Sequence, residues 1–482
     1  MRKSLPSVMQ NINVKSLIPD IKIRGLSTDS KKVTFGDLFI AIKGQKYDGN
    51  DYIESAFKNG AVAVLSDSKV ESSLGGPIIK VRNARKSLSI VAHNFYGNPS
   101  KDIFVIGITG TNGKTSVASI LYSIFFSAGI NSAQIGTLGF LNNTNDQKSS
   151  YTTPEAIELN DYFLKLKKAK STHVVMEVSS HALDQYRVEK IDFNMAVFTN
   201  LTPEHLDYHK TLESYYKTKL KLFKSMSNDS IAVINKSDFH GEKIIKTIKT
   251  PTESYSNTDT GSVHFDSKSV TSSGIKGLII AGNKEYDIDS NLIGEFNCEN
   301  ILAAVTAAHH IGIGKENIED GIKNCKPIPG RMESFDLLKG ATVIIDYAHT
   351  PDAYEKSLKA ISNIIMDNRF IYVVFGAGGD RDKTKRFEMA KITERYCKHC
   401  FITPDNPRYE DPQEISAQII SGYSKKSKYT IYDDRETGLR RALDIALDGD
   451  IVAVLGKGRE QYQEIEGRKN FYSDLNIVRD YQ

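Results

Sequence analysis

A glycine-rich segment at residues 107–115 carries the residue types that bind phosphate. It follows the spacing Gly-x-x-x-x-Gly-Lys-Thr, in which Gly107 and Gly113 are the glycines and Lys114 and Thr115 complete the motif. Glycines let backbone N–H groups converge on phosphate oxygens, the lysine adds a positive charge, and the threonine hydroxyl can ligate Mg²⁺. An apolar run precedes the segment and a helical pattern follows it, which is the context this motif requires. The segment therefore predicts a site for a nucleoside triphosphate.

Two further polar side chains, Glu177 and His205, follow other apolar runs. Taken singly, Glu177 could be a salt-bridge partner and His205 a hydrogen-bonded turn residue. Ligands of an open α/β sheet bind beyond the carboxyl ends of its strands, however, and both residues follow strands of the sheet that carries the phosphate loop. We therefore predict that both contribute to a Mg²⁺ and phosphate site.

Strand-like runs alternate with helical patterns along most of the chain, which predicts an α/β fold with mostly parallel sheets. The first series is almost continuously apolar, as buried parallel strands are, and comprises residues 103–108, 174–178, 195–198 and 230–234. The second series comprises residues 341–345, 370–375, 400–403 and 451–455. A helix after the first run is predicted by the spacing of Val117, Ile120, Leu121, Ile124 and Phe125. Residues 251–290 predict hairpins at the edge of the middle sheet.

The composition describes a globular protein whose charge is almost balanced. The 482 residues are 40% hydrophobic and 25% charged, which excludes a disordered or fibrous chain. The 63 Lys and Arg residues against 59 Asp and Glu residues leave a net charge of only +4, so nothing favours nucleic-acid binding. Four cysteines are too few for a disulfide scaffold, and no signal-peptide core or membrane-spanning run is visible. We therefore expect a cytoplasmic protein that binds neither nucleic acid nor membrane.

Two turn-type segments, residues 98–101 and 327–330, divide the chain into three parts. We expect a small N-terminal α/β domain at residues 1–101. A central P-loop ATPase domain with a mostly parallel sheet should occupy residues 102–329, and a C-terminal Rossmann-like domain should occupy residues 330–482.

A series of short segments between Thr28 and Glu460 indicates a relationship to a known family. They are residues 28–30, 110–115, 152–154, 177–183, 200–205, 294–297, 329–333, 346–352, 376–386, 405–408 and 456–460. In this order they resemble the Mur ligases, the ATP-dependent amide-forming enzymes of peptidoglycan precursor synthesis. Within that family the chain is most similar to the tripeptide synthetases, which add the third residue of the stem peptide.

The resemblance implies a role for each domain and a reaction. The N-terminal domain would hold the UDP-sugar, the central domain ATP, and a mobile C-terminal domain the amino acid. The γ-phosphate of ATP would be transferred to the D-glutamate side chain of UDP-N-acetylmuramoyl-L-alanyl-D-glutamate, and an amine would then attack the acyl phosphate. Mg²⁺ and lysine would neutralise the crowded charge, while domain closure would exclude water.

The resemblance also implies the site residues, position by position. The catalytic set is Lys114, Glu177, His205 and Lys219, and the metal set is Thr115, Glu177, His205 and Lys219. Lys219 matches a lysine that is carbamylated by CO₂ to N6-carboxylysine, which turns a cation into an anionic ligand. The ATP-binding set is Gly110, Thr111, Asn112, Gly113, Lys114, Thr115, Ser116, Asn200, Asn297, Asn300, Arg331 and Asp346. The set for the UDP-sugar peptide is Ser30, Gln45, Lys46, Tyr47, Thr152, Thr153, Ser179, Gln185 and Arg187.

The Asp-Asn-Pro-Arg segment at residues 405–408 bears on the amino acid that is added. In this family it accompanies meso-diaminopimelate, and an arginine can pair bidentately with the distal carboxylate that lysine lacks. The implied amino-acid set is Arg381, Asp405, Asn406, Pro407, Arg408, Gly456 and Glu460, with Glu460 suited to the distal ammonium. Arg459 departs from the family, where histidine is usual. Lanthionine presents the same groups as diaminopimelate, so the sequence leaves both open.

Three alternatives remain: a lysine-adding tripeptide synthetase, a ligase like folylpolyglutamate synthetase, and a non-catalytic binding protein regulated by nucleotide. Folylpolyglutamate synthetases share the fold and the ATP chemistry but lack the segment 405–408. Cys397 and Cys400 form a lone Cys-x-x-Cys pair, which we interpret as thiols at the edge of a strand. The expected partners are small-molecule substrates (ATP, the UDP-dipeptide and a diamino acid), with Mg²⁺ as cofactor and a monomeric chain.

Overall fold

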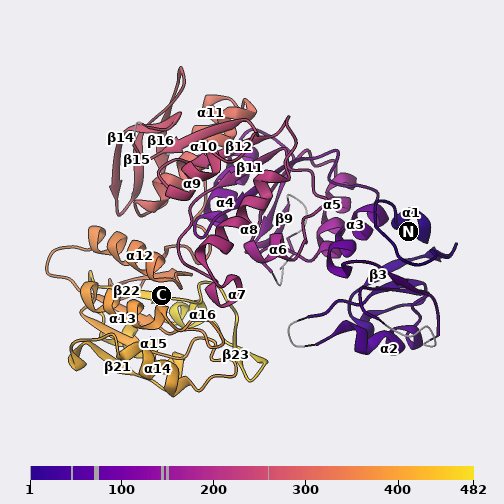
Figure 1. Ribbon diagram of the computed structural model, residues 1–482. Coiled ribbons are helices and arrows are strands. Elements are labelled where there is room, and N and C mark those ends of the chain that lie inside the picture. Colours follow the sequence, from indigo (N-terminus) through magenta and orange to yellow (C-terminus); the bar gives the residue numbers. More distant parts are fainter. Residues whose placement is uncertain (1, 45–46, 70–74, 143–145, 148–150, 259) are drawn as a thin grey trace.

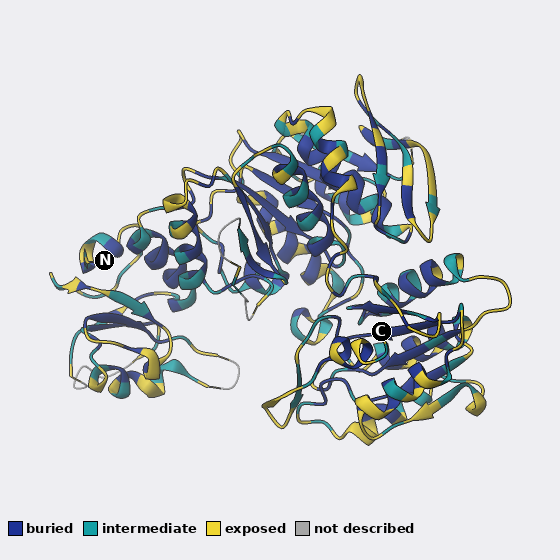
Figure 2. Ribbon diagram, turned by 180° about the vertical axis from the view of Figure 1, so that it is seen from behind, coloured by how far each residue is buried: buried dark blue, intermediate teal, exposed yellow. Residues whose placement is uncertain are grey.

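The computed structural model describes the chain except residues 1, 45–46, 70–74, 143–145, 148–150 and 259. Figure 1 shows three lobes in chain order, each built on its own sheet, with the N-terminal and C-terminal lobes on opposite sides of the central one. Figure 2 shows that the strands of all three sheets are largely buried, while the loops and outer helix faces are exposed. The predicted α/β class is confirmed.

The N-terminal lobe has a parallel four-stranded sheet within its described residues, in the order β3-β4-β5-β6. Its strands are β1 (Lys3–Ser4), β2 (Lys22–Ile23), β3 (Gly25–Ser27), β4 (Asp37–Ile40), β5 (Ala63–Ser66) and β6 (Ile78–Lys80). Its helices are α1 (Leu5–Val8), α2 (Ile53–Lys58) and α3 (Ala84–Tyr96). Helix α3 packs against α5 (Ala156–Lys168) of the central lobe and so joins the two lobes.

The central lobe contains a ten-stranded sheet, counted over the described residues, in the order β16-β15-β14-β13-β12-β11-β7-β10-β8-β9. Its strands are β7 (Phe104–Thr109), β8 (Ser132–Gly136), β9 (Gly139–Asn142), β10 (His173–Glu177), β11 (Met195–Phe198), β12 (Ile231–Asn235), β13 (Thr252–Ser256), β14 (Val263–Thr271), β15 (Gly274–Ala281) and β16 (Lys284–Ser290). The pairing is parallel from β8 to β14 and antiparallel at both ends. The hairpins predicted within residues 251–290 are confirmed as the β14–β15–β16 edge.

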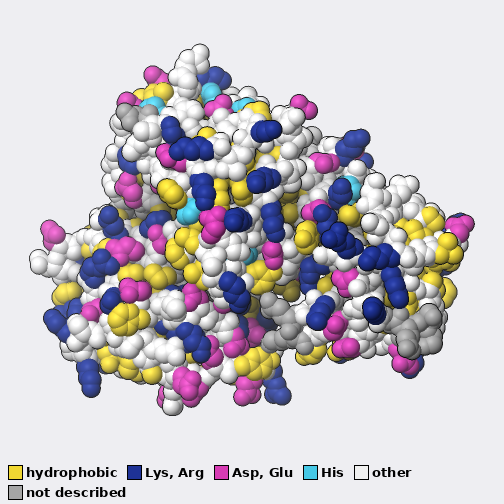
Figure 3. Space-filling model, in the orientation of Figure 1, with side chains coloured by type: hydrophobic (Ala, Val, Ile, Leu, Met, Phe, Trp, Pro, Cys, Tyr) yellow, Lys and Arg dark blue, Asp and Glu magenta, His cyan; other side chains and the backbone are white. Residues whose placement is uncertain are grey.

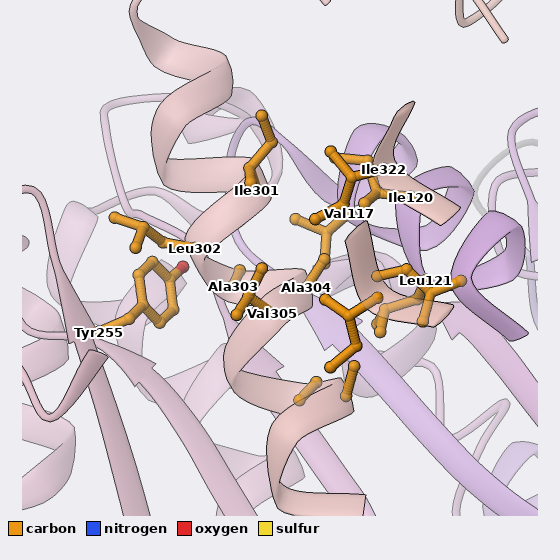
Figure 4. Packing of buried hydrophobic residues seen from close by; sticks show 14 of the residues in the cluster. Val117, Ile120, Leu121, Tyr255, Ile301, Leu302, Ala303, Ala304, Val305 and Ile322 are labelled. Carbon is orange, nitrogen blue, oxygen red and sulfur yellow. The ribbon is translucent and has the colours of Figure 1, made fainter. Parts of the chain in front are cut away.

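Helices cover both faces of this sheet. They are α4 (Lys114–Ser127), α5 (Ala156–Lys168), α6 (Ser180–Asp184), α7 (Leu206–His209), α8 (Leu212–Lys224), α9 (Phe239–Ile245), α10 (Phe296–Ile311) and α11 (Lys315–Lys323). Val117, Ile120 and Leu121 of α4 pack against the face of α10 around Ile301 and Val305 (Figure 4). This packing buries the helical face that the sequence predicted and fixes the start of α4, where the phosphate loop ends.

The C-terminal lobe has a six-stranded sheet over its described residues, in the order β17-β18-β22-β19-β20-β21, parallel except for the edge strand β17. Its strands are β17 (Glu333–Asp336), β18 (Thr342–Asp346), β19 (Ile371–Phe375), β20 (His399–Ile402), β21 (Tyr429–Ile431), β22 (Ile451–Leu455), β23 (Tyr462–Ile465) and β24 (Arg468–Phe471). Its helices are α12 (Pro351–Ile364), α13 (Lys385–Tyr396), α14 (Pro412–Ile420), α15 (Arg435–Ile445) and α16 (Asp474–Arg479). Helices lie on both faces, as predicted for a Rossmann-like sheet.

Two smaller predictions have different outcomes. Cys397 and Cys400 are free and buried, but not at a strand edge, because Cys400 lies in β20 with neighbours on both sides and Cys397 ends α13. In the described part of the chain, no helix has the length and apolar character needed to cross a membrane. Figure 3 shows acidic and basic side chains interleaved over the visible face, which agrees with the nearly balanced charge.

The fully buried ion pair between Arg435 of α15 and Asp474 of α16 gives a test of the C-terminal lobe. Two bonds of 2.9 Å join the side chains. We expect Arg435→Ala to lower the free energy of unfolding by about 3–5 kcal/mol, because Asp474 would keep its charge without a partner. Arg440→Ala, which removes two exposed ion pairs of the same helix, should cost about 1 kcal/mol or less. Urea unfolding followed by circular dichroism compares the two, and equal midpoints would contradict the prediction.

Candidate functional site

The phosphate loop lies between the end of β7 and the start of α4. Gly110 and Gly113 have φ values of 154° and 86°, which favour glycine. A Cβ atom on Gly110 would collide with the Thr199 hydroxyl, and one on Gly113 with the side chain of Asn300. Both positions therefore require glycine, for space as well as for backbone conformation.

Asn200, at the end of β11, holds the loop in shape. Its Oδ1 accepts a 2.9 Å hydrogen bond from the backbone N–H of Asn112, and its carbonyl accepts one of 2.8 Å from Thr111. The Thr199 hydroxyl donates to the carbonyl of Asn112 over 2.6 Å. The neighbouring parallel strand therefore positions the loop.

Glu177, the last residue of β10, presents a buried carboxylate beside the loop. It accepts hydrogen bonds from the Thr115 hydroxyl (3.0 Å), the Thr137 N–H (2.7 Å) and the Thr137 hydroxyl (3.3 Å). Among the described residues, no lysine or arginine forms an ion pair with it. A buried carboxylate next to a threonine hydroxyl, bonded only by neutral donors, fits a divalent cation that would complete its charge balance.

Two lysines converge on the same backbone carbonyl. Lys114 Nζ donates to the Gly110 carbonyl over 3.0 Å, and Lys219 Nζ of α8 donates to the same oxygen over 2.8 Å. Burial and the charge of Lys114 hold the pKa of Lys219 well below its usual range, and burial lowers the pKa of Lys114 as well. Less free energy is therefore needed to deprotonate Lys219 than an exposed lysine.

His205 and Glu204 form the next part of the site. His205 has a left-handed backbone (φ 56°) and packs edge-on against His181, with ring centroids 4.7 Å apart. Burial lowers the pKa of His205 to about 3, despite the adjacent Glu204 carboxylate. Although burial opposes it, the adjacent His205, the hydrogen bond to His349 and the charge of Lys114 hold the pKa of Glu204 well below its usual range. A neutral imidazole is thus available at this position as an electron-pair donor.

A first cleft of about 660 Å³ lies between the central and C-terminal lobes. Of the predicted ATP-binding residues, it is lined by Asn112, Gly113, Thr115, Ser116, Asn200, Asn300, Arg331 and Asp346. The predicted residues that do not line it are Gly110, Thr111, Lys114 and Asn297. Asn297 instead accepts a 2.8 Å hydrogen bond from Asn300 and so orients it. Burial raises the pKa of Asp346, whose oxygens accept the backbone N–H groups of Met332 and Ala348.

A second cleft of about 810 Å³ adjoins the first, and Tyr347 lines both. It brings His205 and Glu204 of the central lobe opposite most of the predicted amino-acid set, namely Arg381, Asp405, Asn406, Arg408, Gly456 and Glu460. Pro407 is the member of that set that does not line it. Arg408 has a left-handed backbone (φ 55°), and its guanidinium bonds to the Gly379 carbonyl (2.6 Å) and pairs with Glu464 (3.3 Å).

The residues predicted to bind the UDP-sugar peptide fall into two groups. Thr153, Ser179, Gln185 and Arg187 are connected in the central lobe: Arg187 donates to the Thr153 carbonyl (2.9 Å) and to Gln185 (2.8 Å), and Thr153 bonds to Ser179. Thr152 lies 3.3 Å from Thr137 through the two hydroxyls. Ser30 and Tyr47 belong to the N-terminal lobe, where Ser30 is buried and Tyr47 exposed. Gln45 and Lys46 lie outside the described residues.

Four residues that the sequence did not assign are part of these sites. Thr137 orients Glu177, His349 lies 2.7 Å from the buried Glu204, and Lys457 is buried beneath the second cleft. Glu204, His349 and Lys457 stand inside or beside segments that carried the resemblance, so position in those segments was the available signal. Nothing in the sequence around Thr137 marked it.

Profiles of three domain families match the chain in succession. They are the "Mur ligase family, catalytic domain" at residues 22–96, the "Mur ligase middle domain" at residues 108–308 and the "Mur ligase, glutamate ligase domain" at residues 330–458. A curated protein of Clostridioides difficile, named UDP-N-acetylmuramoyl-L-alanyl-D-glutamate--2,6-diaminopimelate ligase, is 40% identical and covers 97% of this chain and 96% of its own.

The chain belongs to the Mur ligase family.

As a Mur ligase, it is an ATP-dependent enzyme that forms amide bonds, and its three lobes correspond to the architecture of the family. A solved structure titled as the same diaminopimelate ligase matches with a TM-score of 0.69 and 30% identity, over 100% of this chain and 99% of that one. A folylpolyglutamate synthase of Mycobacterium tuberculosis, solved with ADP and AMPPCP, shares the fold with a TM-score of 0.65 but only 18% identity. It covers 77% of this chain and 92% of its own.

The fit of Gly113 against Asn300 provides a test of the first cleft. We expect Gly113→Ala to weaken binding of a non-hydrolysable ATP analogue by about tenfold or more, because the added methyl displaces the loop or Asn300. The matched control is Gly129→Ala, which follows the same helix, has a similar φ of 66° and has no atom within 4 Å of the added Cβ. Both should lose about 1–2 kcal/mol of stability from backbone strain. Titration calorimetry checks the difference, and equal affinities in the two variants would contradict it.

Proposed function

We propose that this Mur ligase joins diaminopimelate to UDP-N-acetylmuramoyl-L-alanyl-D-glutamate in peptidoglycan precursor synthesis. One observation carries the proposal: Arg408 and Glu460 line the same cleft as His205 and Glu204 of the central lobe. A guanidinium and a carboxylate on one wall suit the distal carboxylate and ammonium of a diamino diacid. The name of the Clostridioides difficile relative supports this choice of amino acid.

The first cleft is the proposed ATP site, with Asn112, Thr115 and Asn300 on one side and Arg331 on the other. Lys114, at the end of the loop, supplies positive charge to the transferred phosphoryl group. Thr115, Glu177 and His205 would hold Mg²⁺, which would neutralise phosphate charge while the acyl phosphate forms. The protein has no preformed cluster of three or more His, Cys, Asp or Glu ligands in its described residues. Phosphate oxygens and a modified lysine would therefore have to complete the coordination.

Lys219 is the proposed fourth metal ligand, as a carbamate. CO₂ reacts with a neutral amine, and the lowered pKa of Lys219 favours that form. Carbamylation would also replace one of the two cations at the Gly110 carbonyl with an anion, which removes their mutual repulsion. Thr152, Thr153, Ser179 and Arg187 are proposed to bind the peptide of the UDP-sugar, and Ser30 and Tyr47 the sugar nucleotide.

The domain boundaries are proposed at residues 101/102 and 329/330. The connections between helix α3 and strand β7, and between helix α11 and strand β17, contain these points. A cytoplasmic location and a monomeric state stay predictions. The non-catalytic alternative is disfavoured because the chain belongs to a ligase family and keeps Lys114, Glu177 and Lys219 together. The likeness to folylpolyglutamate synthase extends to the fold alone.

The proposed role of Lys219 predicts that two lysine substitutions in helix α8 have very different effects on the ligation rate. Lys219→Ala should reduce ligation by about 10²-fold or more, because an anionic ligand near Mg²⁺ is lost. Added short-chain carboxylic acids should restore part of the rate by standing in for the carbamate. Lys217→Ala, which removes an exposed lysine of α8, should keep the parental rate. The measurement is phosphate release with both substrates present. A parental rate for Lys219→Ala in CO₂-depleted buffer would exclude the carbamate.

Two experiments test which amino acid is added: the mass of the product, and the kinetics of an Arg408 variant. The parent should give a tripeptide product with diaminopimelate and with lanthionine in preference to lysine. Arg408→Ala should raise the KM for both diacids by an amount equivalent to roughly 2–5 kcal/mol, because their distal carboxylate would be left unpaired. The distal group does not change in the reaction, so kcat and the KM for ATP should change little.

The control for Arg408 is Arg395→Ala, which removes an arginine that pairs with Glu355 on the surface of the same lobe. It should leave all three KM values unchanged. If Arg408→Ala kept the parental preference for diaminopimelate over lysine, the assignment of the distal carboxylate to Arg408 would be wrong.

A further inference from the structure

Lys457, in the loop after strand β22, is a fully buried lysine beneath the second cleft. Its Nζ lies 3.3 Å from Asp405 Oδ1, 3.1 Å from Asn406 Oδ1 and 3.2 Å from Glu460 Oε2. An ammonium group has three hydrogens, so these three acceptors satisfy it completely. All three acceptors line the cleft, whereas Lys457 itself does not.

The carboxylates of Asp405 and Glu460 each accept the hydrogen bond from Lys457 through one oxygen. Glu460 Oε2 accepts from Lys457 and from the Asn406 side chain (2.9 Å), while no described residue bonds to Oε1. Asp405 Oδ1 bonds to Lys457, while Oδ2 lies beside Gly456, where an added Cβ would be only 3.0 Å away. Gly456 thus leaves open space in front of this oxygen. The lysine therefore fixes one oxygen of each carboxylate and leaves the other to a ligand.

The charges of this group do not cancel. Asp405 and Glu460 contribute two negative charges and Lys457 one positive charge, which leaves one negative charge at the wall of the cleft. Of the described residues, three other cations line the cleft: Arg408 already pairs with Glu464, and neither Arg381 nor Lys385 forms an ion pair with Asp405 or Glu460. A ligand with one ammonium group would complete the balance at Asp405 and Glu460.

We infer that Lys457 is a positioning residue that holds Asp405 and Glu460 so that their free oxygens accept the non-reacting ammonium of the incoming diamino acid. This inference rests on the proposed function, because it assigns a recognition role within the same cleft. Lys457 does not touch the substrate. It acts through the two carboxylates, as a fixed cation behind them.

A purely structural role would not require this arrangement. A buried charge costs free energy, and an apolar side chain of similar volume often gives equal or greater stability at such a position. The lysine has a consequence for the carboxylates: although burial opposes it, the charge of Lys457 holds the pKa of the Asp405 carboxyl below its usual value. The lowered pKa of Asp405 favours its ionised form, as an ammonium-binding wall needs.

The test compares two substrates that differ only in the distal ammonium: diaminopimelate, and 2-aminopimelate, which keeps the distal carboxylate. The parent should prefer diaminopimelate in kcat/KM by about tenfold or more, as expected for hydrogen bonds to charged groups. Lys457→Met should remove most of this preference while the KM for ATP stays the same. A role in folding alone would lower activity with both substrates in proportion and leave their ratio unchanged.

Two further variants make the result decisive. Lys469→Met removes an exposed lysine from the neighbouring strand β24 and should keep the parental ratio. If Lys457→Met does not fold, Lys457→Gln removes the charge and keeps a hydrogen-bond donor at this position. It too should lose the preference. A parent that makes no product with diaminopimelate would refute the proposed function. A parent with the preference and Lys457 variants that retain it would refute this inference alone.

Discussion

Lys114 and Lys219 donate to one carbonyl oxygen, that of Gly110, and the buried carboxylates of Glu177 and Glu204 lie nearby. Removing ionised groups from water costs several kcal/mol each unless they are paired, and here the pairing within the protein is incomplete. The hydrophobic clusters on the two faces of the central sheet supply the stability that keeps these groups in place. We propose that a phosphate chain and a divalent cation complete the pairing of these charges.

Both clefts depend on contacts between the central and C-terminal lobes. Arg331 donates to the Thr115 hydroxyl over 3.3 Å, and the Asn112 side chain donates to Asp352 over 3.1 Å. Glu204 and His349 meet at 2.7 Å farther along the same junction. Residues of the phosphate loop thus bond directly to the lobe that carries the second cleft. A bound nucleotide and the position of the C-terminal lobe are therefore physically linked, as a ligase needs if water is to be kept from an acyl phosphate.

Close to the second cleft, the chain departs from the family at one position. Arg459, where histidine is usual, does not line the cleft but pairs with Glu333, which also accepts a 2.8 Å hydrogen bond from the Gly330 N–H. The additional positive charge of Arg459 is therefore paired with Glu333, at the start of the C-terminal lobe. Arg408, Asp405 and Glu460 line the cleft instead, so the substitution does not alter the groups that are proposed to face the amino acid.

Local patterns in the sequence predicted eight of the buried strands and the helix that follows the phosphate loop. Continuous apolar runs indicate strands that are buried on both faces, and the spacing from Val117 to Phe125 indicates the buried face of a helix. Both patterns are local consequences of backbone geometry. The phosphate loop could be predicted in the same way, because its glycines, lysine and threonine lie close together in the sequence. The resemblance added the remaining site residues by position. It could not tell that Asn297 acts on Asn300 rather than facing the cleft.

Tertiary structure alone decided which charged groups meet. Thr137 reaches Glu177 because β8 and β10 are neighbours in the sheet, and Lys219 reaches Gly110 from a helix more than a hundred residues away. Lys457 touches Asp405 because the loops after β20 and β22 converge, whereas Glu460 lies three residues farther along the loop that carries Lys457. Hydrogen bonds and burial of this kind depend on strand order and register, which periodicity in a sequence does not encode.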